Sequence, residues 1–139
     1  MITKTYLDHL EYQVTGACIE VHRALGPGLL ESIYHECLVT ELKSRNIDFI
    51  SEYQIPLFYK GLPLSAKFRA DLLIENCMIV ELKAVEQIIP IHEAQILSYM
   101  KLLKIPKGLL INFNSVNIVK YGKRSFINDF FPLEVEEDM

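Results

Sequence analysis

Residues 69–84, RADLLIENCMIVELKA, form two apolar runs separated by the polar pair EN. This pattern predicts a β-hairpin with its turn at that pair. Asp71 lies in the first predicted strand, and Glu81 and Lys83 lie in the second. Because successive side chains on a strand alternate between faces, we expect Glu81 and Lys83 on one face and Leu82 on the other. Charges within such an apolar run cost free energy unless each has a partner, so these three charges need an explanation.

The size and composition of the chain favour one globular domain. With 139 residues, half of them hydrophobic, residues 1–139 are expected to fold around one core, with a frayed acidic tail from about 132 to 139. No apolar run approaches the roughly 20 residues of a membrane span, and the N-terminus lacks the continuous apolar segment of a secretory signal. The three cysteines are scattered and form no CxxC pair, which predicts a reducing, cytoplasmic location rather than a disulfide or zinc framework.

The charges are unevenly distributed along the chain. The formal net charge is −4, yet residues 59–127 carry ten Lys and Arg against five acids, and both flanks are acidic. This distribution allows a locally basic face on an acidic protein. The alternative is an ordinary mixed, solvated surface.

Hydrophobic periodicity predicts a mixed α/β (α+β) domain in which helices flank a small mixed sheet. The Gly26-Pro27-Gly28 break separates the first two helices, and Lys60-Gly61 predicts a turn. Besides the hairpin, the expected elements are helices at about 5–25, 30–45 and 92–103 and strands at 49–59, 107–113 and 117–121. The strand at 107–113 is apolar throughout, which predicts a buried strand parallel to a neighbour after a helical crossover.

Two carboxylates and a lysine on neighbouring strands suit metal-assisted phosphodiester hydrolysis. Mg²⁺ prefers oxygen ligands, which Asp71, Glu81 and the backbone carbonyl of Leu82 can supply. Lys83 can position a water molecule for in-line attack and neutralise charge that develops on a phosphate. The alternative is a surface Glu–Lys pair on an edge strand, worth under about 1 kcal/mol.

Three motifs in this sequence are similar to those of known nucleases. Asp71 followed by the E-L-K run from Glu81 to Lys83 resembles the signature of the PD-(D/E)xK nuclease superfamily. Gln95-x-x-x-Tyr99 resembles its QxxxY element, and Gly28 to Tyr34 matches the motif of the GxxExxY family, a small bacterial family assigned to that superfamily. The resemblance extends from about Thr15 to Asn114.

The resemblance implies a restriction-endonuclease-like α-β-β-β-α-β core, preceded here by an extra N-terminal helix. It implies Mg²⁺, with Mn²⁺ as an alternative, held by Asp71 and Glu81, and Lys83 as the catalytic lysine. It further implies that Gln95 contacts the substrate or a water in the site and that Glu31 is the helical acid that completes it. Ala70 stands where the superfamily name has proline, a position that carries no chemistry.

Several residues near these motifs have two interpretations. Tyr34 is expected to orient Glu31 or contact substrate, while Glu31 itself fits a helix N-terminus, where an acid is favoured by the helix dipole. His92 either lines the site or caps its helix, and Tyr99 either contacts substrate or serves as a core aromatic.

We therefore expect a Mg²⁺-dependent nuclease that acts on nucleic acid, with DNA as the favoured substrate. The alternative is a non-catalytic nucleic-acid-binding or protein-interaction module that retains the fold. A compact 139-residue core leaves little room for a target-recognition domain, which predicts low intrinsic sequence specificity. The small size and weak net charge favour the alternative, or a homodimer or partner protein that helps to hold the substrate.

Overall fold

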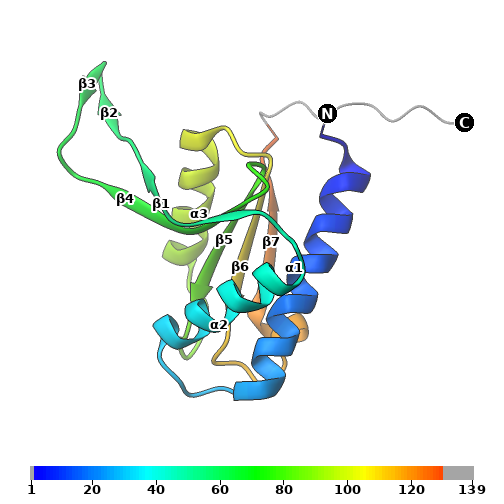
Figure 1. Cartoon of the computed structure of the whole chain (residues 1–139). Helices are drawn as coiled ribbons and strands as arrows, with labels where there is room; N and C mark the ends of the chain where they lie inside the picture. Colours follow the sequence, from blue (N-terminus) through cyan, green and yellow to red (C-terminus); the bar gives the residue numbers. More distant parts are fainter. Residues whose placement is uncertain (1, 130–139) are drawn as a thin grey trace, which may run out of the picture.

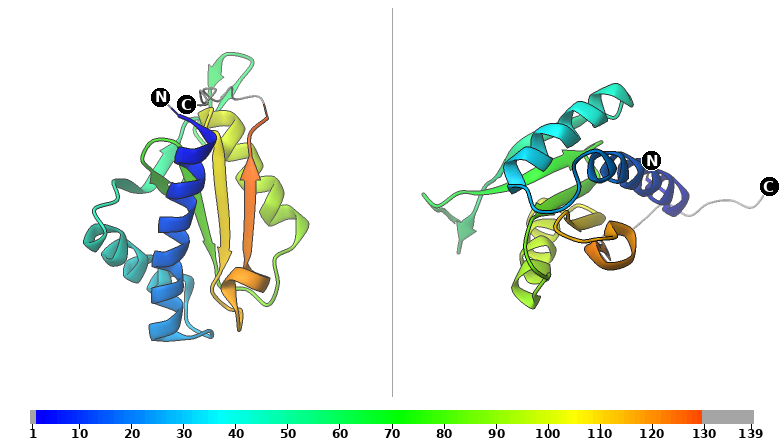
Figure 2. Two further views of the ribbon diagram at one scale, coloured as in Figure 1. Left: turned by 90° about the vertical axis from the view of Figure 1, so that its right-hand side faces the viewer. Right: turned by 90° about the horizontal axis from the view of Figure 1, so that it is seen from below.

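The computed structural model describes residues 2–129 and shows a five-stranded mixed sheet covered by helices on both faces (Figures 1 and 2). The helices are α1 (Lys4–Leu25), α2 (Glu31–Ser44) and α3 (Pro90–Leu103), with a short helical turn, η1 (Ile118–Gly122). The strands are β1 (Phe49–Ile55), β2 (Phe58–Tyr59), β3 (Leu62–Pro63), β4 (Phe68–Ile74), β5 (Met78–Lys83), β6 (Lys107–Asn112) and β7 (Lys123–Ile127). This order confirms the predicted restriction-endonuclease-like arrangement and its extra N-terminal helix.

The sheet has the strand order β1-β4-β5-β6-β7. β4 and β5 form the predicted antiparallel hairpin, and its turn residues Glu75 and Asn76 both have positive φ, at 50° and 56°. β6 runs parallel to β5 after the α3 crossover, as its apolar sequence predicted. β5 is thus the central strand, so the alternative interpretation, a surface Glu–Lys pair on an edge strand, is wrong.

Two hydrophobic cores, one on each face of the sheet, enclose β5. α1 and α2 cover the face that carries Val80 and Leu82, and α3 covers the face that carries Ile79 (Figure 2). α3 lies so close to β6 that a Cβ at Gly108 would fall 2.6 Å from the Met100 sulfur, which explains the glycine. The face that Glu81 and Lys83 share is therefore also covered by a helix.

A half-buried ion cluster joins α1 to the β6–β7 side of the sheet. The two carboxylate oxygens of Glu11 each lie 2.6 Å from an ammonium group, one from Lys107 on β6 and one from Lys123 on β7. Burial alone would raise the pKa of Glu11, but hydrogen bonds and charges from the two lysines outweigh it, so the pKa is lowered. Two of the ten cations in the basic part of the sequence are thus used inside the fold.

Two segments differ from the sequence-based prediction. The strand expected at 49–59 ends at Ile55, because Pro56 lacks the N–H that would continue the ladder, and Phe58–Tyr59 pairs with Leu62–Pro63 in a separate two-stranded ribbon. The predicted edge strand at 117–121 is wrong, since this segment forms η1 and the edge strand follows as β7. The Asn117 side chain caps this turn by accepting a hydrogen bond from the Lys120 N–H.

The described part of the chain also bears on three smaller expectations. Cys18 and Cys77 are buried, Cys37 is partly exposed, and all three are free thiols. None of the helices within residues 2–129 combines the length and apolar character that crossing a membrane requires. The tail expected to be frayed, 132–139, lies outside the described residues.

Candidate active site

Asp71 and Glu81 lie where β4 separates from β5. The β4–β5 ladder ends at the pair Leu72–Val80, and the next pair in that register would be Asp71 and Glu81. Side chains replace the missing backbone bonds: the Asp71 N–H donates to Glu81 Oε1 at 3.0 Å, and the Leu82 N–H donates to Asp71 Oδ2 at 2.7 Å. The two carboxylates are therefore held side by side by the backbone.

The pairing of β4 with its other neighbour, β1, is also interrupted at Asp71. In the β1–β4 register, Ser51 pairs with Leu72 and Tyr53 with Ala70, but Glu52 does not pair with Asp71. Glu52 has a φ of 54°, a left-handed conformation that costs a non-glycine residue free energy. Such local strain is common at functional sites, and here both neighbouring strands leave Asp71 outside the regular ladder.

The buried carboxyl group of Glu81 is strongly perturbed. Glu81 is 5% exposed. Burial, followed by repulsion from the Asp71 carboxylate, raises the pKa of Glu81 to about 9, although the charge of Lys83 acts in the opposite direction. Glu81 therefore holds its proton at neutral pH unless a cation lies beside it.

Glu31, at the first residue of α2, lies in the same electrostatic environment. Partial burial and then the Asp71 carboxylate raise the pKa of Glu31, while the charges of Lys83 and His35 lower it. Glu31 thus lies close enough to Asp71 and Lys83 to interact with both, and the structure brings together the three acids and the lysine that the sequence suggested.

The α3 residues lie beside the same pair. Tyr99 is almost fully buried and is hydrogen-bonded to Gln95 one turn earlier. Burial and the charges of Glu81 and Asp71 raise the pKa of the Tyr99 hydroxyl, whereas the Gln95 hydrogen bond lowers it. Tyr99 therefore connects Gln95 to the carboxylate pair.

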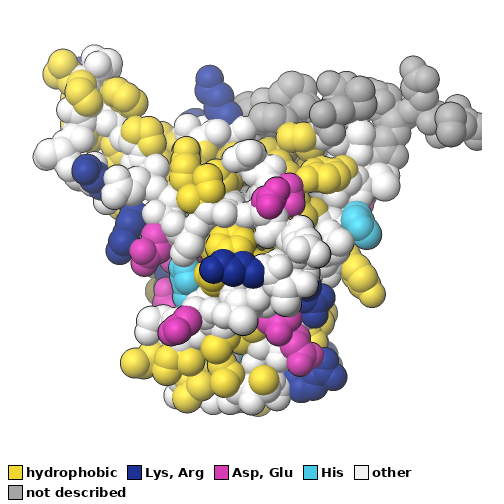
Figure 3. Space-filling model, in the orientation of Figure 1, with side chains coloured by type: hydrophobic (Ala, Val, Ile, Leu, Met, Phe, Trp, Pro, Cys, Tyr) yellow, Lys and Arg dark blue, Asp and Glu magenta, His cyan; other side chains and the backbone are white. Residues whose placement is uncertain are grey.

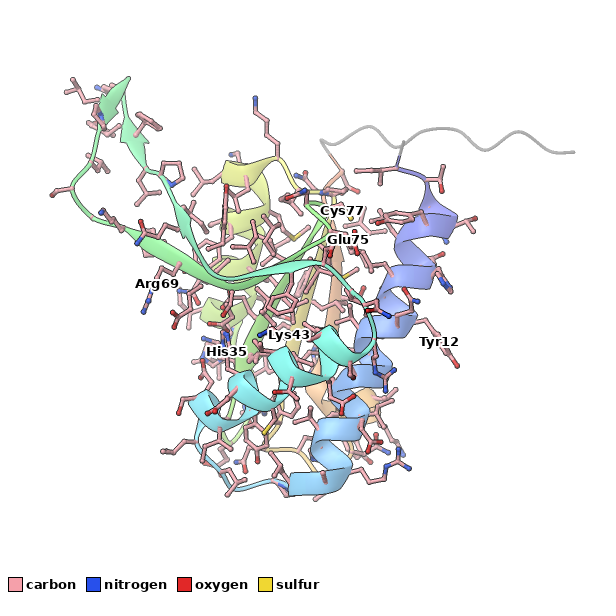
Figure 4. All side chains as sticks on the ribbon, in the orientation of Figure 1. Tyr12, His35, Lys43, Arg69, Glu75 and Cys77 are labelled. Carbon is pink, nitrogen blue, oxygen red and sulfur yellow. The ribbon has the colours of Figure 1, made fainter. Side chains whose placement is uncertain are left out.

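An open groove leads to this cluster from the surface. It has a volume of about 610 Å³, and Glu31, His35, Arg69 and Asp71 are among the residues that line it. Arg69 and Asp71 share one face of β4, two residues apart. Arg69 on β4 and His35 on α2 lie on the same side of the molecule (Figure 4). The groove thus gives solvent and ligands access to Asp71.

Two residues expected to contact substrate have other roles in the structure. Tyr34 has no exposed surface: its hydroxyl donates to the Gly26 carbonyl at 2.6 Å and accepts from the Leu29 N–H at 3.1 Å, and its ring stacks on Phe113 at 4.6 Å. The expected substrate contact of Tyr34 is therefore wrong, and the residue instead fixes the turn that leads to Glu31.

His92 has the capping role that was its alternative. Its Nδ1 accepts a hydrogen bond from the Ile89 N–H at 3.2 Å at the start of α3. A neutral His92 therefore carries its proton on Nε2. Contact between that nitrogen and a substrate remains a prediction.

Asn112 is a site-supporting residue that the sequence analysis missed. It is buried opposite Lys83 in the β5–β6 register, where its Nδ2 donates to the Val85 carbonyl at 2.9 Å and its Oδ1 accepts from the Val85 N–H at 3.1 Å. The backbone after Lys83 is further fixed because the Phe113 N–H donates to the Lys83 carbonyl at 2.8 Å. A single amide at the end of an otherwise apolar strand was the available signal.

The oxygen-rich donor set fits a hard divalent cation held by few protein ligands. Two adjacent carboxylates suit Mg²⁺ or Mn²⁺, which retain several waters. Across residues 2–129, no group of three or more His, Cys, Asp or Glu side chains is arranged to hold a metal. Any cation here would therefore take Asp71 and Glu81, with backbone, water or substrate oxygens completing its shell.

Comparison with known proteins agrees with this class of site. The sequence profile described as the PD-(D/E)XK nuclease superfamily matches residues 8–125, so the chain belongs to this superfamily. A solved structure entitled "Crystal structure of SSO0001" is similar in fold, with a TM-score of 0.53 and 24% sequence identity, over 74% of this chain and 50% of that one. The chain thus matches about half of that protein's length. No curated protein sequence matches the chain.

Proposed function

We propose that this protein is a metal-dependent nuclease of the GxxExxY type that hydrolyses phosphodiester bonds in nucleic acid, with DNA as the favoured substrate and the cytoplasm as its location. The observation that carries the proposal is the Asp71–Glu81 pair, held outside the regular ladder beside Lys83 and open to a groove. Structural ion pairs neutralise one another, whereas this pair places two acids together at a cost in free energy.

The cost of the carboxylate pair is relieved by a cation. Mg²⁺ or Mn²⁺ at Asp71 and Glu81, with the Leu82 carbonyl as a further oxygen ligand, would supply electrophilic stabilisation of a bound phosphate. Because the pKa of Glu81 is about 9 without a metal, cation binding releases a proton at neutral pH. Both carboxylates would then be ionised and would serve as oxygen ligands of the cation.

The remaining roles follow from position. Lys83 shares a face of β5 with Glu81, and this supports assigning to its ammonium group the roles of holding the attacking water and neutralising charge on the phosphate oxygens. The water oxygen bonds to phosphorus and gives up a proton to solvent, while the bond to the leaving sugar oxygen breaks and that oxygen takes up a proton from solvent. The charges of Glu31 and Lys83 interact, and Tyr99 is hydrogen-bonded to Gln95. We assign to Glu31 and Tyr99 the roles of positioning Lys83 and Gln95.

Cleavage assays with matched variants test this proposal. Wild type, Asp71→Asn, Lys83→Ala and the surface control Lys101→Ala are incubated with single- and double-stranded DNA and RNA in Mg²⁺, Mn²⁺ or EDTA. We expect metal-dependent cleavage that falls by about a hundredfold or more in the first two variants and is unchanged in the control. Full activity in Lys83→Ala contradicts the assigned mechanism. Metal-independent binding without cleavage in the wild type identifies the alternative, a non-catalytic binding module.

A further inference from the structure

The ribbon formed by β2 and β3 projects from the molecule as an arm, defined here as residues 56–67 (Figure 1). β2 and β3 pair only with each other and form a sheet of their own. A two-stranded ribbon has little stability in isolation and gains order from what it contacts. The arm therefore has the character of a binding element rather than of a core element.

Both faces of the arm are apolar and exposed. Phe58 pairs with Pro63 and Tyr59 with Leu62, so each face carries one aromatic ring and its cross-strand partner. Phe58 is 63% exposed and Tyr59 60% exposed. Such rings, presented at the tip of a ribbon, are available for stacking.

The arm and the start of β4 carry only positive charge. Residues 56–69 contain Lys60, Lys67 and Arg69 and no acid, in a chain with a net charge of −4. The Lys60 ammonium lies 5.4 Å from the centre of the Tyr59 ring. Figure 3 shows hydrophobic side chains at the tip of the arm and cationic ones below them, towards the body. Exposed rings among cations form a surface complementary to a polyanion that has planar groups.

The groove below the arm has the opposite charge. Glu31, Glu36, Glu52 and Asp71 line it, with Arg69 as its cationic residue. A nucleic-acid strand that enters this acidic groove needs cations elsewhere for its affinity, because phosphate neutralisation supplies most of that affinity. The arm provides them, and β4 connects the arm directly to the groove.

A hollow at the base of the arm adds a third feature. It has a volume of about 260 Å³, and Ile55, Pro56, Phe58 and Leu64 line it, with Lys67 at the same site. An apolar hollow with one cation suits a planar base attached to a phosphate. A base that remains paired within a duplex does not fit, since its faces are already stacked on its neighbours.

We propose that the arm binds single-stranded nucleic acid and delivers it to the Asp71–Glu81 site. This inference rests on the proposed function and specifies its substrate: unpaired bases stack on Phe58 and Tyr59, and backbone phosphates contact Lys60, Lys67 and Arg69. The preference for single strands follows from stacking, which is available only to unpaired bases. Base-specific hydrogen bonds are not required, so sequence preference is low.

Fluorescence anisotropy tests the arm separately from catalysis. A labelled oligothymidine and a labelled duplex are titrated with wild type, Phe58→Ala/Tyr59→Ala and Lys60→Ala/Lys67→Ala, in EDTA to prevent cleavage and then in Ca²⁺. We expect the wild type to prefer the single strand. The aromatic double variant should lose about tenfold in affinity per ring, and the lysine variant should show a weaker salt dependence.

Matched controls use exposed residues that do not belong to the arm. Tyr12→Ala on α1, 79% exposed, and Lys101→Ala/Lys104→Ala at the end of α3 should bind like wild type. Circular dichroism establishes that each variant is folded, and sedimentation velocity reports self-association. Equal loss in the controls, unchanged binding in the arm variants, a duplex preference, or an arm-dependent dimer in place of nucleic-acid binding overturns the proposal.

The same variants distinguish failure of the arm from failure of the proposed function. Wild type that cleaves, with arm variants that bind normally, overturns the arm alone. Wild type that binds through the arm but does not cleave supports the arm and contradicts the nuclease activity.

Discussion

Glu11 and Glu81 are both acids inside the fold, Glu11 half-buried and Glu81 buried, and the charges beside them differ in sign. Glu11 lies between two lysines, which lower its pKa, whereas Glu81 lies beside Asp71, which adds to the effect of burial and raises its pKa to about 9. The two lysines compensate the charge of Glu11, so removing this acid leaves their charges unpaired. A buried acid beside another acid destabilises the metal-free fold, and a ligand has to compensate for it. Burial of charge alone therefore does not identify the site, while the sign of the neighbouring charge does.

The largest expected effect concerns Glu11. Glu11→Ala leaves the buried Lys107 and the half-buried Lys123 without their acid. It should lower the free energy of unfolding by about 3 kcal/mol, the lower end of the range for a fully buried pair, measured by urea denaturation at pH 7. The matched control is Glu20→Ala on the same helix, which removes an exposed pair with Arg23 and should change stability by less than about 0.5 kcal/mol. If Glu11→Ala and Glu20→Ala both change the free energy of unfolding by less than about 0.5 kcal/mol, the proposed difference between Glu11 and Glu81 is contradicted.

Divalent cations should stabilise the protein by binding at Glu81 and Asp71 and should not bind at Glu11. At a Mg²⁺ concentration a hundred times its dissociation constant, the folded protein should gain about 2.7 kcal/mol, with release of a proton near pH 7, measured by calorimetry in buffers of different ionisation enthalpy. Asp71→Asn should abolish this gain. A gain that persists in that variant would place the cation elsewhere.

Neutralising Glu81 should stabilise the metal-free protein. Because the folded state holds the Glu81 proton more tightly than the unfolded chain, its contribution to stability is present below the ordinary pKa of about 4.5 and is lost as the pH rises towards 9. Glu81→Gln keeps the shape and removes this loss. At pH 8 it should exceed wild type by at least about 1.4 kcal/mol, the value of one pKa unit, and at pH 4 the two should agree. If Glu81→Gln is less stable than wild type at pH 8, the folded protein stabilises the Glu81 carboxylate and the expectation is contradicted.

The smallest effect is expected at Glu31, the exposed acid of the site. Glu31→Gln should change the unfolding free energy by less than about 0.5 kcal/mol and shift the metal concentration needed for half-maximal cleavage. A large loss of stability would assign Glu31 a structural role at the start of α2.

The helices and strands that were predicted correctly are those whose hydrophobic pattern lies within the element itself. The apolar runs of β4, β5 and β6 and the helical spacing of α1, α2 and α3 were sufficient, because burial requires those patterns. β7, KRSFI, was missed because an edge strand with polar residues has neither pattern. The arm was merged with β1 because aromatic residues continue past Pro56, and only pairing distinguishes the two.

The site was predicted in part for the same reason. The spacing of Glu81 and Lys83 on one strand fixes their common face. The family resemblance named Asp71, Glu31 and Tyr99, and the structure shows that these three interact electrostatically with members of the same cluster. Tyr34 was misassigned because a motif gives no information about burial. Asn112 was missed because its contribution depends on two hydrogen bonds to Val85, a residue 27 positions away.

The replacement of backbone acceptors by carboxylates has a spectroscopic consequence. The amide protons of Asp71 and Leu82 are bonded to Glu81 and Asp71 oxygens instead of to carbonyl groups. A ligand that takes those oxygens weakens or re-orients both bonds, while the amides of the neighbouring Leu72–Val80 pair keep their ladder partners. Two amide resonances in the centre of the sheet thus become internal indicators of site occupancy, readable by chemical shift and hydrogen exchange without any attached probe.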